Sequence, residues 1–168
     1  AYTLAAATAT TRAVRECGVD ATIKWPNDVQ LGERKLAGVL TEMQGETDRI
    51  SWLVVGIGLN ANLDPDELPA ETAATSLQAA VGGVNRRIVT QEIIERFWEL
   101  VTAERGEITD GWRELNSTLG QRVRIETPGE TIIGDAVDVS YPGTLVVETD
   151  TGCVEVATGD CEHLRPVE

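Results

Sequence analysis

The spacing of hydrophobic and polar positions changes several times along this chain, and each change predicts a different kind of element. Residues 2–17 are rich in alanine, contain neither glycine nor proline, and are followed by Gly18. This composition is typical of a helix that ends at a left-handed glycine. From residue 21 to residue 60, short apolar runs are separated by Gly, Asp and Asn, which predicts three or four mostly antiparallel strands.

Helical patterns return in the middle of the chain. Residues 62–71 hold two prolines and four acidic residues, which indicates a surface loop ahead of a short helix over residues 75–81. Thr90 is a candidate cap for an amphipathic helix, and a second, weaker helical pattern follows it. The apolar positions of these two helices are Ile93, Ile94, Phe97, Leu100 and Val101 in the first and Ile108, Trp112, Leu115 and Leu119 in the second.

Beyond Gly120 the pattern changes again. Short alternating runs separated by Pro-Gly and Thr-Gly turns indicate five short strands, which favours a small barrel. The predicted fold class is therefore α+β, with a mixed, mostly antiparallel sheet packed by helices and a small β-barrel after it. We place the first domain at residues 1–117 and the barrel at residues 118–168.

The balance of charge narrows the range of partners. The chain has 28 acidic and 14 basic residues, and its formal charge is −14. Charge of this sign repels phosphate backbones, which argues against direct binding of nucleic acid. It also suits a halophilic protein, whose surface is rich in Asp and Glu and poor in lysine. Only Lys24 and Lys35 are lysines, and because the other twelve basic residues are arginines, these two become candidates for a site.

The cysteines and the absence of long apolar runs bear on the compartment. Cys17, Cys153 and Cys161 are an odd number, and no apolar run approaches the roughly 20 residues that span a bilayer. We therefore expect a cytoplasmic protein without a membrane partner. Cys153, Cys161 and His163 are close in sequence, but their spacing matches no common zinc pattern. We interpret them as two small strand residues and a surface imidazole, and assign no metal-binding side chains.

Two short segments carry candidate chemistry. Residues 24–28 read Lys-Trp-Pro-Asn-Asp at the end of a predicted strand, where a loop on a stiff support can hold side chains against a ligand. Residues 34–38 read Arg-Lys-Leu-Ala-Gly and begin the next long strand. Lys24 and Lys35 are therefore expected to face one cleft with a phosphate or carboxylate between them. The alternative is that both lysines are solvated strand ends and that Trp25 is a core residue.

A pair of glycines adds to this picture. Gly56 and Gly58 lie two residues apart in the strand Val-Gly-Ile-Gly-Leu-Asn, so both lack a side chain on the same face. Backbone there can approach a flat ligand closely. The pair is not a dinucleotide fingerprint, because the third glycine is missing and the pair lies within a strand. A simple β-bulge is the alternative interpretation.

Together these segments resemble the biotin protein ligase family, whose catalytic domain carries Lys-Trp-Pro-Asn-Asp, Arg-Lys-Leu-Ala-Gly and Gly-x-Gly-x-Asn in this order. All three are present without a substitution, and residues 74–77 match the family's later Ala-Thr-Ser-Leu. The resemblance implies a fold like that of class II aminoacyl-tRNA synthetases followed by an SH3-like barrel. The family's Gly-Arg-Gly-Arg-x-Gly-Arg loop and Ser-Thr pair have no counterpart here, so we expect a catalytic domain truncated at its N-terminus.

The resemblance also implies roles for individual residues. Lys24 would stabilise negative charge on the ATP α-phosphate, and Lys35 would contact biotin or its activated carboxyl group. Asp28 would lie near the nucleotide or its Mg²⁺. The implied catalytic residues are Lys24 and Lys35, the implied biotin-binding residues are Lys35, Gly38, Gly56 and Gly58, and the implied nucleotide-binding residues are Trp25, Asn27, Asp28 and Asn60.

The family reaction has two steps. Biotin and ATP first give biotinyl-5'-adenylate and pyrophosphate, and the amine of an acceptor lysine then attacks the mixed anhydride. The expected substrates are thus ATP and biotin, with Mg²⁺, and the expected partner is a biotin carboxyl carrier domain, while a homodimer is left open. Because one wall of the site is expected to be missing, we expect weak or no ligase activity from these 168 residues alone.

Other interpretations stay open at this point. A lipoate-type ligase catalyses the same class of reaction, although Lys-Trp-Pro-Asn-Asp is typical of the biotin branch. A non-catalytic effector-binding or regulatory module, or an acidic scaffold whose barrel binds a partner, belongs to a different class of function. Calorimetry with biotinyl-adenylate discriminates the scaffold from the others, because a scaffold would give no heat.

Overall fold

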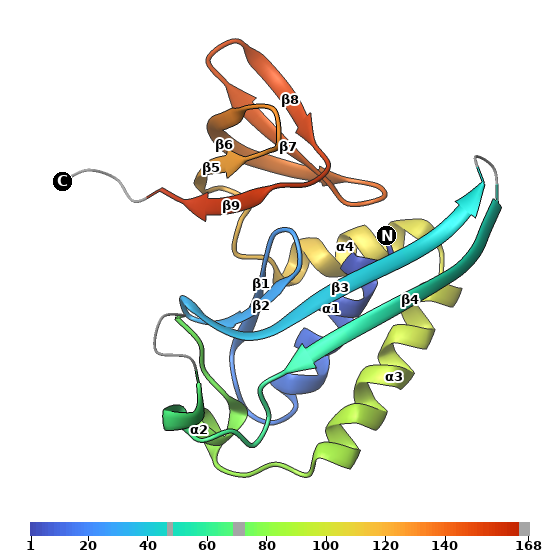
Figure 1. Ribbon diagram of the computed structural model, residues 1–168, viewed down its shortest axis with the longest axis vertical. Coiled ribbons are helices and arrows are strands. Elements are labelled where there is room, and N and C mark those ends of the chain that lie inside the picture. Colours follow the sequence, from blue (N-terminus) through green and yellow to red (C-terminus); the bar gives the residue numbers. More distant parts are fainter. Residues whose placement is uncertain (47–48, 69–72, 165–168) are drawn as a thin grey trace.

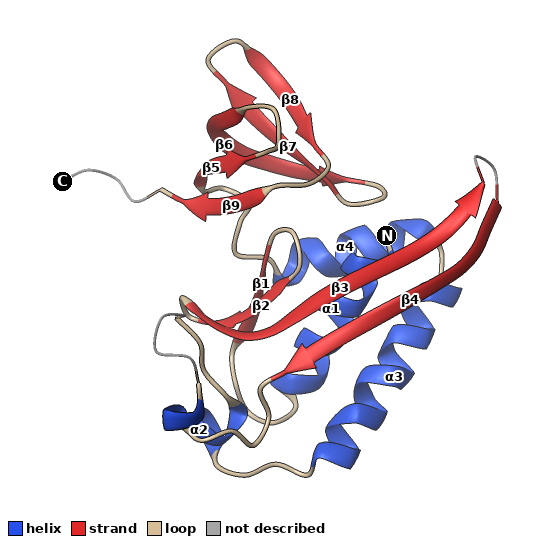
Figure 2. Ribbon diagram, viewed as in Figure 1, coloured by secondary structure: helices blue, strands red, loops and turns tan. Residues whose placement is uncertain are grey.

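The computed structural model describes residues 1–46, 49–68 and 73–164, which form a helix-backed four-stranded sheet followed by a five-stranded sheet (Figures 1 and 2). The elements of the first part are α1 (Tyr2–Arg15), β1 (Ala21–Lys24), β2 (Asp28–Leu31), β3 (Arg34–Glu46), β4 (Arg49–Leu59), a 3-10 turn (Pro65–Glu67), α2 (Leu77–Val81), α3 (Arg86–Thr102) and α4 (Arg105–Leu115). Those of the second are β5 (Arg122–Glu126), β6 (Thr131–Ser140), β7 (Thr144–Thr149), β8 (Gly152–Val156) and β9 (Asp160–His163).

Helix α1 lies at the centre of the first part, as its composition predicts. Its alanine and threonine side chains are short, so α3, α4 and the sheet can approach it closely. The buried Thr10 and Thr11 hydroxyls donate to the carbonyls of Ala6 and Ala7 at 2.7 and 2.8 Å, which satisfies their polar atoms inside the core. The result is a tightly packed helical layer behind the sheet.

The first sheet has the strand order β1-β2-β3-β4, and every neighbouring pair is antiparallel. Ile23, Val29 and Val39 are buried on the face that α1 covers, whereas Leu40 and Val54 on the opposite face are exposed. Figure 1 shows β3 and β4 passing in front of α1 and α3, which leaves the second face uncovered. This alternation is the period of two that the sequence predicts.

The four predicted helices are confirmed, with two differences at their ends. Helix α3 begins at Arg86 rather than behind Thr90, because the Asn85 side chain accepts the backbone N–H groups of Arg87 and Ile88. Asparagine is among the best N-caps, and here it caps the helix one turn earlier than expected. Helix α4 ends at Leu115, so the predicted helical position Leu119 lies outside it.

The predicted five strands after Gly120 are confirmed as a second antiparallel sheet in the order β8-β7-β6-β5-β9. This sheet shares one hydrophobic cluster with α1, α4 and β1, while two further clusters lie within the first part alone. Arg113 of α4 donates to Asp138 Oδ1 and to the Val139 carbonyl, both at 2.8 Å. The guanidinium group lowers the pKa of the Asp138 carboxyl below its ordinary value. The mixed α+β fold class is therefore confirmed, and none of the described helices is long and apolar enough to cross a membrane.

Candidate functional site

Four residues from four neighbouring strands form one row across the first sheet. Lys24 lies opposite Asp28, and Asp28 lies opposite Gly38. Gly38 in turn lies opposite Gly58. Directly paired residues of antiparallel strands point to the same face, and the neighbouring Ile23 is buried toward the helices. The row therefore lies on the face away from the helices, which we call the open face.

Lys35 also lies on the open face, where it binds Asp28. Its Nζ atom is 2.6 Å from Asp28 Oδ1, and the two side chains are partly exposed. A Cβ atom on Gly38 would lie 3.1 Å from Lys35 Cε and 3.2 Å from its Nζ. The lysine side chain therefore lies over Gly38, and a side chain at that position would displace the ammonium group.

Bare glycine backbone forms the floor beside this ion pair. A hollow of about 450 Å³ is lined by Asn27, Lys35, Gly38, Val39, Leu40, Gly56, Ile57 and Gly58. Gly56 and Gly58 pair regularly with β3, since the register of this pair of strands shifts only between Gln44 and Gly45. The β-bulge interpretation of the two glycines is therefore wrong.

Packing within the fold does not require these two glycines. A Cβ atom on Gly56 would lie 3.7 Å from the Leu40 carbonyl oxygen, and one on Gly58 would lie 3.9 Å from that of Gly38. Both are ordinary van der Waals distances, so alanine would fit the backbone at either position. A side chain at either position would instead fill the open space above the sheet. The two glycines therefore favour a role in holding a ligand.

Lys24 lies on the same face but in a different hollow. This hollow has a volume of about 490 Å³ and is lined by Lys24, Gln30, Glu33, Glu162, His163 and Leu164. The two lysines thus line different hollows of one face, and a ligand shared between them stays a prediction. Asp28 separates them in the row and binds Lys35, while the end of β9 encloses Lys24 from the other side.

The two asparagines of the motifs hold the walls in place. The side-chain amide of Asn27 donates to the Val39 carbonyl at 2.6 Å, and the Val39 N–H donates to the Asn27 carbonyl at 3.0 Å. Asn60 donates through its side chain to Thr75 and accepts the N–H of Leu77 through its carbonyl. Asn27 lines the glycine-floored hollow, whereas Asn60 ties the end of β4 to the start of α2.

Trp25 is buried, and its predicted contact with a nucleotide stays a prediction. The Trp25 side chain is 1% exposed, and its indole N–H donates to the Gly143 carbonyl at 3.0 Å. Its backbone N–H donates to the Thr118 hydroxyl at 2.9 Å. Trp25 is thus a core residue that joins the motif to the second sheet, which is the alternative considered for it from the sequence.

The sequence predicts a surface imidazole at His163, but in the structure this side chain lies beside Lys24. His163 is partly buried, lines the Lys24 hollow, and contacts the Thr118 hydroxyl at 3.2 Å. Burial and the nearby Lys24 ammonium group lower the pKa of His163 below 6.5. No sequence pattern indicates this contact, since 45 residues separate the two partners.

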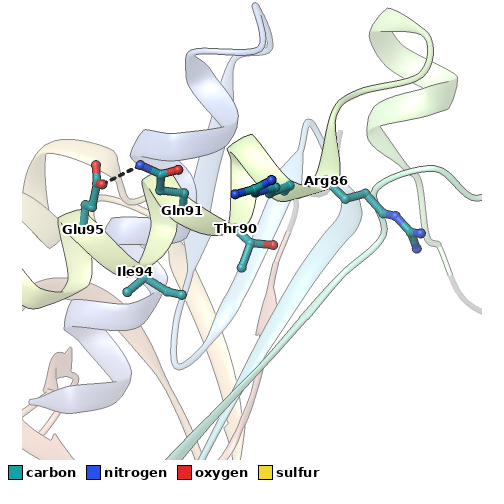
Figure 3. A pocket seen from close by; sticks show the side chains of 6 residues that line it. Arg86, Thr90, Gln91, Ile94 and Glu95 are labelled. Carbon is teal, nitrogen blue, oxygen red and sulfur yellow. Dashed lines mark hydrogen bonds between the residues drawn. The ribbon is translucent and has the colours of Figure 1, made fainter.

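A further hollow of about 460 Å³ lies on the surface of α3, as Figure 3 shows. Its lining residues all come from that helix: Arg86, Arg87, Thr90, Gln91, Ile94 and Glu95. The Gln91 amide donates to the Glu95 carboxylate at 2.8 Å, so these two side chains satisfy each other. This hollow lies outside the three sequence motifs, and no residue of those motifs lines it.

The described residues do not by themselves form a magnesium site. No group of three or more His, Cys, Asp or Glu side chains within the described ranges could hold a metal ion. The carboxylate of Asp28 is bound to Lys35. Burial raises the pKa of the Cys161 thiol to about 11, which keeps it protonated and disfavours metal binding. We therefore derive no chemical step through Mg²⁺.

Comparison with known proteins bears directly on these segments. Residues 1–60 match the model of the Biotin/lipoate A/B protein ligase family, and residues 118–164 match that of the Biotin protein ligase C terminal domain. The chain belongs to the biotin protein ligase family. The resemblance identified from the three motifs is thus confirmed, and a regulatory module without ligase ancestry is not favoured.

Biotin protein ligases similar to this chain include the Bifunctional ligase/repressor BirA of Bacillus subtilis, which is 34% identical over 168 residues. The alignment covers 95% of this chain and 52% of the relative, so the chain spans about half of that protein's length. A biotin–acetyl-CoA-carboxylase ligase of Mycobacterium tuberculosis is 31% identical over 147 residues, covering 85% of this chain and 53% of the relative.

Solved biotin protein ligases share the fold. The apo structure from Aquifex aeolicus superposes with a TM-score of 0.84 at 26% identity, covering 97% of this chain and 75% of that one. The structure of the same enzyme in complex with biotin and ATP gives a TM-score of 0.78 at 27% identity, with 98% and 71% covered.

Proposed function

We propose that this chain supplies part of the active site of an ATP-dependent biotin protein ligase, which activates biotin as biotinyl-5'-adenylate and transfers it to a lysine of an acceptor protein. The observation that carries the proposal is the hollow in which Lys35 lies over Gly38 beside Gly56 and Gly58. A flat apolar ring system fits against bare backbone, and a compact ammonium group suits the carboxyl group attached to it.

Biotin binding requires Lys35 to exchange partners. Its ammonium group is bound to Asp28, and an incoming carboxylate would compete with Asp28 for it. Both side chains are partly exposed, so the pair is weak enough to open at a modest cost, on the order of 1 kcal/mol. Asn27, held by Val39, would then define the end of the hollow nearest the ligand's carboxyl group.

Lys24 is the group that we assign to the nucleotide. It lies next to Asp28 in the row, so an elongated biotinyl-adenylate lying along the row would reach from the glycine floor into the Lys24 hollow. An ammonium group positioned at the α-phosphate stabilises the charge that develops as the biotin carboxylate attacks, and single donors of this kind contribute ~3 to 4 kcal/mol. Holding the two reactants together would add an entropic advantage of up to ~7 to 11 kcal/mol.

The proposal extends to partners and surroundings. A biotin carboxyl carrier domain is the acceptor that we propose, and a homodimer stays a prediction. We also propose that the second sheet is an SH3-like barrel, and that the protein is cytoplasmic and halophilic. The last point rests on the formal charge of −14 and the presence of only two lysines. Mg²⁺ would accompany ATP, held mainly by phosphates and water.

Calorimetric titration of the 168-residue chain with biotinyl-5'-adenylate tests the proposal. We expect measurable but weak binding, and we expect Lys35→Ala to weaken it by about tenfold through loss of a charge-assisted contact. Arg124→Ala makes the same change in net charge at an exposed position of β5 in the second sheet and serves as the matched control. Absence of heat with the unaltered chain would overturn the proposal.

Kinetics separates the roles of the two lysines. In a ligase assay of the protein that contains this segment, Lys24→Ala is expected to lower the rate of adenylate formation by roughly 10² to 10³. The KM for biotin should change little, because Lys24 does not line the glycine-floored hollow. An unchanged rate of adenylate formation would show that the role assigned to Lys24 is wrong.

A further inference from the structure

The strand end that bears Lys24 is held on both of its flanks by the segment that joins α4 to β5. On one flank, the Ser117 backbone N–H donates to the Ile23 carbonyl at 2.8 Å, and its hydroxyl donates to the same oxygen at 3.2 Å. On the other flank, the Trp25 N–H donates to the Thr118 hydroxyl at 2.9 Å. The backbone before and after Lys24 is thus fixed by residues about 90 positions later in the chain.

Thr118 is the centre of this arrangement. It is 0% exposed, so its hydroxyl group has to find its partners within the protein. The oxygen accepts the Trp25 N–H, and the same oxygen lies 3.2 Å from His163 Nε2. His163 is also a wall of the hollow into which Lys24 projects. The His163 imidazole therefore contacts the hydroxyl that anchors the Lys24 backbone, and it also lines the hollow that holds the Lys24 side chain.

The direction of the bond between Thr118 and His163 depends on which ring nitrogen of His163 carries the proton. Burial, then the nearby Lys24, lower its pKa from the ordinary value of 6.5, and Glu33 acts in the opposite sense. At neutral pH the imidazole is therefore uncharged. We assign the neutral tautomer in which Nε2 is unprotonated, because the Thr118 O–H can then donate to Nε2 while the oxygen lone pairs accept the Trp25 N–H. Protonation at Nε2 would turn this acceptor into a donor and leave the hydroxyl without its fixed orientation.

We propose that His163, acting through the Thr118 hydroxyl, is a positioning residue for Lys24 in the proposed ligase reaction. The inference rests on the proposed function, because it assumes that Lys24 acts on the reacting phosphate. It makes the second sheet a contributor to the active site, although its residues lie far from the motifs in sequence. A displacement of Lys24 by ~1 Å is enough to reduce catalysis by up to ~10²-fold.

Amide hydrogen exchange of the 168-residue chain tests the tether without any need for activity. In His163→Ala, the Thr118 hydroxyl loses its acceptor, and we expect the Trp25 amide to exchange about tenfold faster. The Val39 amide, which donates to Asn27, should be unaffected. His163→Gln places an amide oxygen near the position of Nε2 and should restore slow exchange. Asp160→Asn on the same strand is the control.

The outcomes are distinct. Equal acceleration at Trp25 and Val39 would mean that His163 only stabilises the whole fold, and an unchanged Trp25 amide would mean that it does not hold the strand end. Either result, or a failure of His163→Gln to restore protection, overturns the proposal. An exchange response in the 168-residue chain, together with an absence of ligase activity in the protein that contains this segment, would instead count against the proposed function and leave the tether supported.

Enzyme kinetics supplies the second readout. In the protein that contains this segment, His163→Ala should lower the rate of adenylate formation about tenfold. The KM for biotin should stay within roughly twofold of its original value, since the glycine floor is untouched. In the unaltered protein the rate should fall as the pH drops through the lowered pKa of His163, and this inflection should be absent from His163→Gln. Lys24, Glu33 and Glu162 are the charged groups that face the same hollow. A KM effect in place of a rate effect would overturn the positioning role.

Discussion

Lys35 Nζ and Asp28 Oδ1 lie 2.6 Å apart, and the lysine side chain crosses the bare backbone of Gly38 to reach the carboxylate. The ammonium group is a compact point charge, so a ligand carboxylate and the Asp28 carboxylate compete for it. We therefore expect the ion pair to lower the affinity of the glycine-floored hollow for anionic ligands.

Replacement of the carboxylate should strengthen biotin binding. Asp28→Asn keeps the size of the side chain but removes the competing charge, and we expect the Kd for biotin to fall about fivefold, equivalent to roughly 1 kcal/mol for a partly exposed pair. Calorimetry with biotin measures the change, and Glu130→Gln in an exposed turn controls for net charge. Weaker binding would show that Asp28 itself supports the ligand.

A substitution in the glycine floor should weaken ligand binding without lowering the free energy of unfolding. Gly58→Ala should leave the free energy of unfolding unchanged or raise it by about 0.5 to 1 kcal/mol, because the new Cβ meets only an oxygen 3.9 Å away. The same methyl group should weaken binding of biotinyl-adenylate by roughly tenfold, since it occupies space above the sheet. Denaturant unfolding and calorimetry measure the two effects.

Gly134→Ala is the matched control for this substitution. A Cβ atom there would lie 2.3 Å from the Glu148 carbonyl oxygen, so the variant should lose stability, although it lies far from the hollow. If Gly58→Ala behaved like Gly134→Ala, the floor would be a packing feature and its assignment to a ligand would be wrong.

Trp25 should affect stability rather than binding. Trp25→Phe keeps the buried ring but leaves the Gly143 carbonyl without its indole donor, at a cost of about 1 to 3 kcal/mol. Because the side chain is 1% exposed, we expect the affinity for ATP to stay within about twofold once the variant is folded. A large loss of nucleotide affinity with little change in stability would restore the direct contact implied by the family.

Salt should stabilise the protein. With a formal charge of −14, repulsion among acidic residues is expected to oppose folding, and screening shortens its range to ~3 Å at 1 M ionic strength. We expect the midpoint of thermal unfolding to rise between dilute buffer and 1 M KCl. A midpoint that falls or stays constant would argue against the halophilic assignment.

The sequence by itself determined the elements and the composition of the glycine-floored hollow. Alternation of apolar residues predicts the strands around Ile23 and Val39, and the two-residue spacing of Gly56 and Gly58 places both on one face. These are local properties, because the side-chain period of a strand depends only on backbone geometry. The three motifs similarly led to the family before any contact was known.

Only the tertiary structure decided how the site is divided. The registers of two ladders place Asp28 between Lys24 and Gly38, and the docking of β9 puts His163 beside Lys24. Such relations depend on side chains up to about 140 positions apart, and a local pattern carries no information about which distant surfaces meet. The burial of Trp25 has the same origin, because Gly143 and Thr118 reach it only after the second sheet has packed against the first.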